Sequence, residues 1–414
     1  MNKYAILETV FGYSSFRNNQ EEIIDSLIAN KDTIAIMATG GGKSLCFQIP
    51  SLLNDGITIV ITPLIALMEN QVDELKKRRI KAVFINSEQD FFEQKVVIQK
   101  LKDNFFKFLY ISPEKLENHD FVAFLKELEI SYLIIDEAHC VSVWGNDFRL
   151  SYRLIKGFLE GMKKRPTVGA FTATADKYVL NDIVNLIGLK EYNLFKSTFD
   201  RPNLFYGTYM LKNRFDFLVK YLLKQGQTAG IIYVLTRKKT DELHQKLLSL
   251  GFKVVKYHGG LEPNEKSLNQ NDFMTGKANL ICATSAFGMG INKPDIRFVI
   301  NYDLPLTMED LVQQSGRCSR DGKAGECLLF FSQEAIQTCE YFIRQTRAVT
   351  KEETKELIKY KYQKLRKVIE YSQTNKCLHQ YIVNYFGEIN HLLCANCSNC
   401  QKKKQKRQRL AYIR

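Results

Sequence analysis

A glycine-rich loop near the amino terminus has residue types that can bind phosphate. Residues 36–44 read Ile-Met-Ala-Thr-Gly-Gly-Gly-Lys-Ser, between a β-rich run at 32–36 and the apolar pattern of a helix. A strand, a glycine loop and a helix start form the context of a phosphate-binding loop, in which backbone N–H groups and the helix N-terminus face the phosphates. Lys43 can reach the β- and γ-phosphates of ATP, and Ser44 can ligate Mg²⁺.

This loop departs from the strict phosphate-loop pattern at Met37, where that pattern has glycine. The alternative, a flexible glycine turn, leaves the Lys-Ser pair and the flanking strand unexplained. The loop therefore predicts a nucleotide site without fixing the class of ATPase. Its candidate nucleotide-binding residues are Thr39, Gly40, Gly41, Gly42, Lys43 and Ser44.

An apolar run that ends in two acids and a histidine supplies the second chemical group. Residues 132–139 read Tyr-Leu-Ile-Ile-Asp-Glu-Ala-His. A buried parallel strand delivers such carboxylates to its carboxyl end, where ligands of open α/β sheets bind. Asp136 suits Mg²⁺, Glu137 can polarise the attacking water, and His139 can hydrogen-bond across the site. An isolated Asp-Glu at a strand end is usually a solvated turn, but here it follows a phosphate loop.

Two arginines three residues apart form a third candidate group. Arg317 and Arg320 lie within residues 313–322, which we expect to be helical, so that the two side chains share one face. Two guanidinium groups on one face can clamp a γ-phosphate. The alternative is a surface helix with salt bridges, which is the usual meaning of an isolated Arg-x-x-Arg.

Four cysteines near the carboxyl terminus have the spacing of a metal site. Cys377, Cys394, Cys397 and Cys400 are separated by 16, 2 and 2 residues. Four thiolates form a closed structural Zn²⁺ site, and Cys₄ can also hold an iron–sulfur cluster. The bacterial ferredoxin run would place another cysteine at position 404, which is lysine here, so we favour zinc. His379 and His391 are then spare.

Two halves of the chain alternate short apolar runs with charged helical stretches, which predicts an α/β fold with parallel sheets. Residues 197–203, with a proline and polar residues, suit a linker between the halves. From about residue 336 the strand signal stops, and residues 352–373 read as a helix. The expected strands are 33–37, 57–62, 106–112, 132–136 and 168–172 in the first half, and 230–235, 254–258, 280–284, 298–302 and 327–331 in the second.

Composition restricts the class of protein and its partners. The chain has 414 residues with 45% hydrophobic and 25% charged residues, as in soluble globular proteins of two or three domains. No run approaches a membrane span or a signal peptide, and the scattered cysteines argue against secretion. We expect a cytoplasmic protein, nucleoid-associated in a bacterium, or a nuclear one. The net charge of +14 favours a polyanionic partner.

Together these motifs resemble those of superfamily 2 helicases and, more narrowly, of the RecQ family of DNA helicases. The superfamily motifs are 38–44, 136–139, Thr-Ala-Thr-Ala at 172–175 and 313–322. The RecQ likeness rests on 11–20, 140–149, 286–294 and the terminal cysteines, which follow one another in order over about residues 10–400. The resemblance implies two RecA-like lobes and a helical zinc-binding subdomain. It also implies that ATP, Mg²⁺ and Zn²⁺ are bound.

The resemblance also implies further site residues. Gln20 and Arg17 match the adenine-reading motif, with Tyr13 stacking on the base; the alternative for Tyr13 is a core aromatic. Residues 140–149 are similar to the aromatic-rich loop that senses DNA. Trp144, Asp147, Phe148 and Arg149 are kept, whereas positions 143 and 146 in the loop and 150 and 151 after it depart from the family pattern. Trp144 could instead pack under the sheet. The implied contacts to DNA phosphates are Thr62, Ser112 and Thr284.

The expected domains are a first lobe at 1–203, a second lobe at 204–335, the zinc-binding subdomain at 336–402 and a basic tail at 403–414. The family implies 3′-to-5′ movement on single-stranded DNA and unwinding of forked DNA, in repair and recombination, by what we expect to be a monomer. Only 14 residues follow Cys400, too few for the winged helix of longer members. The chain would then separate strands in a different way or need a protein partner. Alternatively, it would be a DNA-stimulated ATPase and adapter that unwinds poorly. An RNA helicase is disfavoured by the aromatic loop.

Overall fold

A computed structural model describes residues 2–17, 19–38, 40–63, 65–86, 89, 91–145, 148–288, 293–348, 350–388 and 394–412, without the side chains of 65, 66, 91 and 406–412. The chain divides into two compact units, Met1–Ser197 and Thr198–Arg414. The break falls at 197/198, whereas the predicted first lobe ends at 203. The four predicted domain ranges stay predictions.

The first unit is built on a seven-stranded sheet in which every pairing is parallel, in the order β3-β4-β2-β5-β6-β1-β7. Parallel strands need crossover connections, and helices supply them. Short 3₁₀ helices η1 (Pro113–Glu117), η2 (Ala138–Val141) and η3 (Leu150–Arg153) interrupt the longer connections. The strands are β1 (Asp32–Ile36), β2 (Ile57–Ile61), β3 (Ala82–Ile85), β4 (Phe108–Ile111), β5 (Ile130–Ile135), β6 (Thr167–Thr172) and β7 (Tyr192–Lys196).

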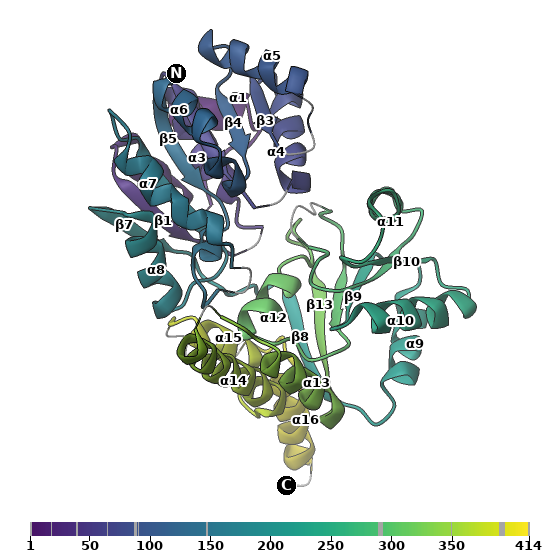
Figure 1. Ribbon diagram of the computed structural model, residues 1–414. Helices are drawn as coiled ribbons and strands as arrows, with labels where there is room; N and C mark the ends of the chain where they lie inside the picture. The colour runs from purple at the N-terminus through teal and green to yellow at the C-terminus, as the bar shows by residue number, and fades with distance from the viewer. Residues whose placement is uncertain are drawn as a thin grey trace. The chain divides into compact units, whose positions relative to one another are not determined.

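Helices cover both faces of this sheet (Figure 1). Ala35 and Val60 pack with α2, α3 and α4 in one core cluster. The alternating residues Ile34 and Ile59 are also fully buried, so the other face is covered too. The helices of this unit are α1 (Lys3–Thr9), α2 (Gln20–Ile28), α3 (Lys43–Leu53), α4 (Ile65–Lys77), α5 (Phe91–Lys102), α6 (His119–Glu127), α7 (Leu154–Glu160) and α8 (Lys177–Ile187).

The second unit begins with a six-stranded, all-parallel sheet in the order β10-β11-β9-β12-β13-β8. Its core joins the sheet to helices α9 and α10. The strands are β8 (Leu204–Met210), β9 (Gly230–Tyr233), β10 (Val254–Tyr257), β11 (Leu280–Ala283), β12 (Phe298–Asn301) and β13 (Gly325–Phe331); the helices are α9 (Arg214–Gln225), α10 (Arg237–Ser249), α11 (Pro263–Thr275) and α12 (Met308–Ser315).

The rest of the second unit is helical and lies against strand β8. It consists of α13 (Gln333–Arg344), α14 (Lys351–Gln373), α15 (Leu378–Tyr385) and α16 (Ser398–Tyr412). Tyr206 of β8 forms an isolated parallel bridge with Cys397, which ties the cysteine-bearing segment to the sheet. The backbone of the basic tail continues α16 as far as Tyr412.

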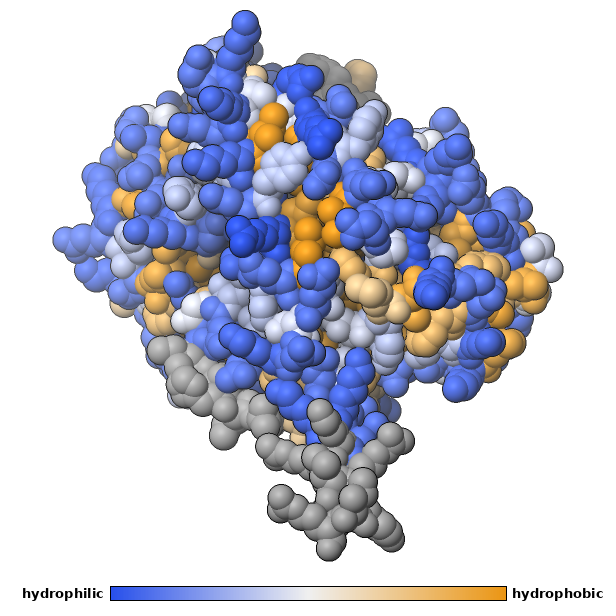
Figure 2. Space-filling view, turned by 90° about the horizontal axis from the view of Figure 1, so that it is seen from below, coloured by the Kyte–Doolittle hydropathy of each residue, from blue (hydrophilic) through white to orange (hydrophobic). Residues whose placement is uncertain are grey.

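The predicted fold class is confirmed: two parallel sheets are followed by helices with four cysteines. All ten predicted strands are present within a few residues of their predicted limits, and the predicted helix at 352–373 is α14. Three further strands, β3, β7 and β8, were not predicted. Among the described residues, no helix is both long and apolar enough to cross a membrane. The face shown in the space-filling view is mainly hydrophilic (Figure 2).

Candidate functional site

The glycine loop has the backbone geometry of a phosphate cradle. It connects β1 to α3, and Gly40 and Gly42 have φ angles of 83° and 82°, a conformation that favours glycine. Lys43 begins α3, so the N–H groups of that helix start are at the loop. A Cβ on Gly42 would lie 2.3 Å from Nε2 of Gln20, so this position admits no side chain without a shift.

The predicted adenine-reading residues lie against this loop. The Gln20 amide donates to the carbonyl of Gly41 at 3.1 Å, and its oxygen accepts from the backbone N–H of Arg17 at 2.9 Å. The Arg17 guanidinium donates to the Gly40 carbonyl at 3.2 Å. Tyr13 is 51% exposed, so the core alternative does not hold for it. The structure thus brings Gln20 and Arg17 together beside the loop, while Thr39 lies outside the described residues.

Of the two predicted catalytic acids, Glu137 lies against both the lysine of the glycine loop and the histidine of its own motif. Asp136 and Glu137 follow β5 directly and are both buried. Glu137 lies 3.5 Å from Nζ of Lys43 and 3.4 Å from Nδ1 of His139. His139 also hydrogen-bonds the hydroxyl of Thr172 at 3.0 Å, which connects it to the end of β6. The structure therefore joins residues from the first, second and Thr-Ala-Thr-Ala motifs in one site.

Backbone conformation and burial make this acid pair unusual. Glu137 has φ 49° and ψ 47°, a left-handed conformation that is costly for a residue with a Cβ and is typical of functional sites. Burial and the neighbouring Glu137 raise the pKa of Asp136 to about 6, although Lys43 acts to lower it. The site thus holds negative charge that a cation would stabilise.

The aromatic loop is attached to the acid motif by direct contacts. The N–H of Arg149 donates to the Cys140 carbonyl at 2.9 Å, which closes the loop onto η2. A Cβ on Gly145 would lie 2.4 Å from the His139 carbonyl, so the loop backbone approaches the motif more closely than a side chain would allow. Trp144 is partly buried, with its ring 5.9 Å from that of Tyr178. The backbone of the aromatic loop is therefore in direct contact with the segment that carries His139.

Other predicted DNA-contacting residues differ in accessibility. Phe148 is 39% exposed, and Arg149 is ion-paired with Glu114 at 3.0 Å, in the segment that follows Ser112. Ser112 is partly buried. Thr62 is fully buried and Thr284 is 9% exposed, so their side chains offer DNA little surface in this conformation.

The arginine motif does not have the helical geometry that we predicted. Helix α12 ends at Ser315, and both arginines lie in the following turns, where Ser319 has a φ of 46°. They are therefore not on one helical face. Arg317 is 5% exposed. Burial and the nearby Arg317 lower the pKa of Arg320 to about 9. We call residues 316–323 the arginine loop.

The four cysteines form a compact cluster whose sulfur atoms all lie within 4.8 Å of one another. Sγ of Cys394 and Sγ of Cys400 are 3.9 Å apart, close to the roughly 3.8 Å between two thiolates on one tetrahedral Zn²⁺ with Zn–S bonds of about 2.3 Å. The N–H groups of Leu378 and Cys400, near the starts of α15 and α16, donate to Sγ of Cys397 at 3.5 and 3.4 Å. Such donors stabilise thiolate charge, so the donor set fits zinc.

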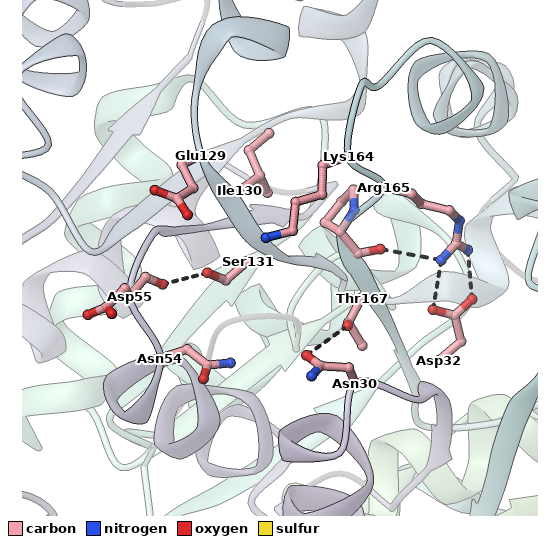
Figure 3. Close-up of a pocket in the computed structure, with 11 residues that line it drawn as sticks. Asn30, Asp32, Asn54, Asp55, Glu129, Ile130, Ser131, Lys164, Arg165 and Thr167 are labelled. Atoms are coloured by element: carbon pink, nitrogen blue, oxygen red, sulfur yellow. Dashed lines mark hydrogen bonds and ion pairs between the residues drawn. The ribbon is translucent and has the colours of Figure 1, made fainter.

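A cavity of about 450 Å³ lies at the opposite edge of the first sheet from the glycine loop. It is lined by residues at the starts of β1, β5 and β6, including Asp32 and Thr167 (Figure 3). Arg165 makes a bidentate pair with Asp32 at 3.0 and 2.6 Å, and Ser131 donates to the Asp55 carbonyl. Because ligands of parallel sheets bind at the carboxyl ends of strands, this cavity is separate from the nucleotide site.

Sequence reasoning missed several residues that hold these sites together. His379, which we took as spare, bonds Asp200 through Nδ1 at 2.8 Å and the Leu204 carbonyl through Nε2 at 3.0 Å. His391 lies outside the described residues. The hydroxyl of Ser142 donates to Asp182 of α8 at 2.6 Å beneath the aromatic loop. These contacts join residues distant in sequence, and no local pattern indicates them.

Three family models match successive parts of the chain. A DEAD/DEAH box helicase model matches residues 17–183, a helicase conserved C-terminal domain model matches 213–322, and a RecQ zinc-binding model matches 333–401. These ranges contain the glycine loop, both arginines of the arginine loop and the cysteine cluster, respectively.

Curated relatives are similar over most of the chain. An ATP-dependent DNA helicase RecQ of Bacillus subtilis is 39% identical over 95% of this chain and 66% of its own length. A probable ATP-dependent DNA helicase RecS of the same organism is 40% identical over 84% of this chain and 70% of its own length. The chain spans 61% to 66% of the first three curated relatives. Among solved structures, Saccharomyces cerevisiae Dbp5 bound to RNA and ADP BeF3 has a TM-score of 0.65 at 19% identity, over 88% of this chain and 97% of that one, a likeness of fold alone.

Proposed function

Because the chain belongs to the RecQ family of DNA helicases, we propose that it couples ATP hydrolysis to 3′-to-5′ movement along single-stranded DNA and to the unwinding of forked duplexes. One observation supports this coupling most: the aromatic loop is hydrogen-bonded to η2 and packed on the carbonyl of His139. A base that moves Trp144 would thereby move the segment that carries His139. Through the family relation, we extend the proposal to DNA repair and recombination.

Nucleotide binding in this proposal rests on the glycine loop. The loop N–H groups and Lys43 bind the phosphates, while Gln20 and Arg17 hold the loop and read the adenine, on which Tyr13 stacks. Mg²⁺, when bound, would neutralise charge on the phosphates, and Ser44 and Asp136 are the residues that would hold it.

Hydrolysis in this proposal depends on residues of both units. Glu137 orients the attacking water, and its carboxylate is held between Lys43 and His139 in the free protein. Arg317 and Arg320 stabilise the charge that develops on the γ-phosphate. Zn²⁺, when bound, would be held by the four cysteines and would crosslink the helical end of the second unit.

DNA stimulation of ATP hydrolysis tests this proposal. We expect turnover to rise at least tenfold with single-stranded DNA, to rise less with RNA of the same sequence, and to be lost in Lys43→Ala, because that change removes the phosphate-binding cation. Lys31→Ala is the matched control, since the ammonium of Lys31 forms an exposed pair with Glu191, away from the glycine loop. ATP turnover that does not rise with DNA, or that is retained in Lys43→Ala, would contradict the proposal.

A further inference from the structure

The segment that joins the two sheets is bonded on two sides within the second unit. We call residues 198–203 the connector. The sequence predicts a linker here because of its proline and polar residues. In the structure, side chains of α15 and of the residues directly after it hold one side of the connector, and its own side chains hold the arginine loop on the other.

The first side is held by residues adjacent to the cysteine cluster. Glu388 accepts from the Thr198 hydroxyl and from the Phe199 N–H, both at 2.7 Å. The ring of Phe199 stacks on that of Phe386 with centroids 3.9 Å apart. His379 pairs with Asp200 at 2.8 Å. The connector is therefore held by a carboxylate, a ring pair and an imidazole, whose contacts offset the conformational entropy lost when the segment is ordered.

The second side supports the arginine loop through its carbonyl groups. The Arg201 guanidinium donates to the carbonyls of Cys318 and Ser319 at 3.2 and 3.1 Å. Asn203 donates to the carbonyls of Ser319 and Lys323 at 3.4 and 2.8 Å. Nε of Arg201 also donates to the Asn203 side chain at 3.3 Å, so the two residues act as one unit.

These donors matter because the loop has no regular secondary structure of its own. After α12 ends, the carbonyls of the loop lack helical partners, and buried backbone acceptors without partners are costly. Ser319 is buried with a left-handed backbone, a conformation that persists only where the surroundings impose it. Arg201 and Asn203 both donate to its carbonyl and thus supply part of that constraint.

We propose that Arg201 and Asn203 are positioning residues that hold Arg317 and Arg320 in the arrangement needed for ATP hydrolysis, with the connector supported by α15 and the residues directly after it. The proposal rests on the assigned role of the two arginines in the proposed function. It adds a physical link from the cysteine-bearing helices, through residues 198–203, to the arginine loop.

The first test separates turnover from nucleotide binding. In Arg201→Met we expect kcat for DNA-stimulated ATP hydrolysis to fall at least tenfold, with KM for ATP within twofold of wild type. Arg201→Lys should recover at least half of kcat, because an ammonium can still donate to both carbonyls. The matched control is Arg214→Met, which removes an arginine that donates to a carbonyl and a carboxylate in the same unit but not to the arginine loop.

A second measurement does not depend on enzymatic activity, so it distinguishes failure of this positioning proposal from failure of the proposed function. Amide hydrogen exchange of residues 316–324 should be at least tenfold faster in Arg201→Met than in wild type and unchanged in Arg214→Met. Asn203→Ala should also speed exchange of these residues, but by a smaller factor. Unchanged exchange in Arg201→Met overturns the proposal whatever the ATPase result. Faster exchange with unchanged kcat in an active enzyme overturns the positioning role.

Discussion

Asp136 and Glu137 are consecutive carboxylates that the fold buries, with exposed fractions of 5% and 8%. Two such charges in a low-dielectric site repel each other and lose hydration, so the site costs stability when no cation is bound. That cost is consistent with the proposed function, because the same arrangement holds the ammonium of Lys43 and would attract a divalent cation. The left-handed backbone of Glu137 adds to it.

This cost predicts that Asp136→Asn stabilises the first unit in the absence of Mg²⁺. The pKa of Asp136 is about 6 in the folded chain against its ordinary value of 3.8, so the folded state binds the proton more tightly. The ionised carboxylate of Asp136 therefore destabilises the folded state fully above about pH 6, and this effect vanishes below pH 3.8. We expect a gain of about 3 kcal/mol in unfolding free energy at pH 7.5, shrinking towards pH 4.5, from denaturant titrations.

Asp32→Asn is the matched control, because this buried aspartate is paired bidentately with Arg165. Removing one partner of a buried pair leaves the other charge unpaired, so this change should destabilise the unit at pH 7.5. A loss of stability in Asp136→Asn at pH 7.5, or a gain that does not change with pH, would contradict the account of the acid site.

Trp144 is the residue through which we expect DNA to act on hydrolysis. Its ring is partly buried beside that of Tyr178, and base stacking on an aromatic side chain contributes about 1–3 kcal/mol per base. Trp144→Ala should weaken binding of single-stranded DNA by that amount. It should also remove most of the stimulation by DNA, while turnover without DNA stays within threefold of wild type. Tyr192→Ala, on an exposed ring of β7, is the control. Full stimulation in Trp144→Ala would exclude the aromatic loop as the sensor.

At the scale of elements, the strands that could be predicted from the sequence are those marked by a short-range pattern. The ten predicted strands are apolar runs with β-branched residues, and all ten are present. Strand β7 escaped prediction because its residues are mainly exposed at a sheet edge, so it has no apolar run. Strand β8 begins directly after the connector, whose proline suggests a break in regular structure. Strand β7 was therefore missed because it is polar, and β8 because a proline precedes it. In the structure, both strands pair with neighbouring strands of their sheets.

In the candidate site, too, some features follow from local sequence patterns and others depend on residues far away in sequence. The residue types of the glycine loop, the acid motif and the cysteine cluster were predictable because each chemistry demands a short local pattern. The arginine loop was predicted as helix from its i, i+3 spacing, but Ser319 adopts a left-handed backbone held by Arg201 and Asn203. His379 looked spare because its partners, Asp200 and Leu204, are far away in sequence. Long-range partners of this kind decide local conformation and leave no local signal.

The cysteine cluster predicts that metal removal loosens the helical end of the second unit. Four thiolates should hold one Zn²⁺ per chain, measurable by its release to a colorimetric chelator. Cys397→Ser should abolish zinc binding, lower the Tm by several degrees and speed hydrogen exchange in α15, because that helix donates to the lost sulfur. Cys339→Ser, at a buried cysteine outside the cluster, should retain zinc. A full complement of zinc in Cys397→Ser would contradict the assignment.

The whole molecule carries a net charge of +14 and ends in a run with seven lysines or arginines among its last 14 residues. Such an excess favours a polyanion and makes binding fall with salt concentration. Charge does not distinguish DNA from RNA, and neither does the fold, since it is shared with proteins solved in complex with RNA or DNA. The distinction in this account comes from the RecQ zinc-binding region and the aromatic loop.

Unwinding of a forked DNA duplex with a 3′ single-stranded tail tests the central claim most directly. Wild-type protein and Glu137→Ala should bind the fork with equal affinity, since Glu137 is buried in the acid site. We predict that only the wild type separates the strands, and only with ATP and Mg²⁺ present. DNA-stimulated hydrolysis without strand separation would assign the chain to ATPases that act as adapters. Strand separation by Glu137→Ala at the wild-type rate would contradict the role of this site in driving movement.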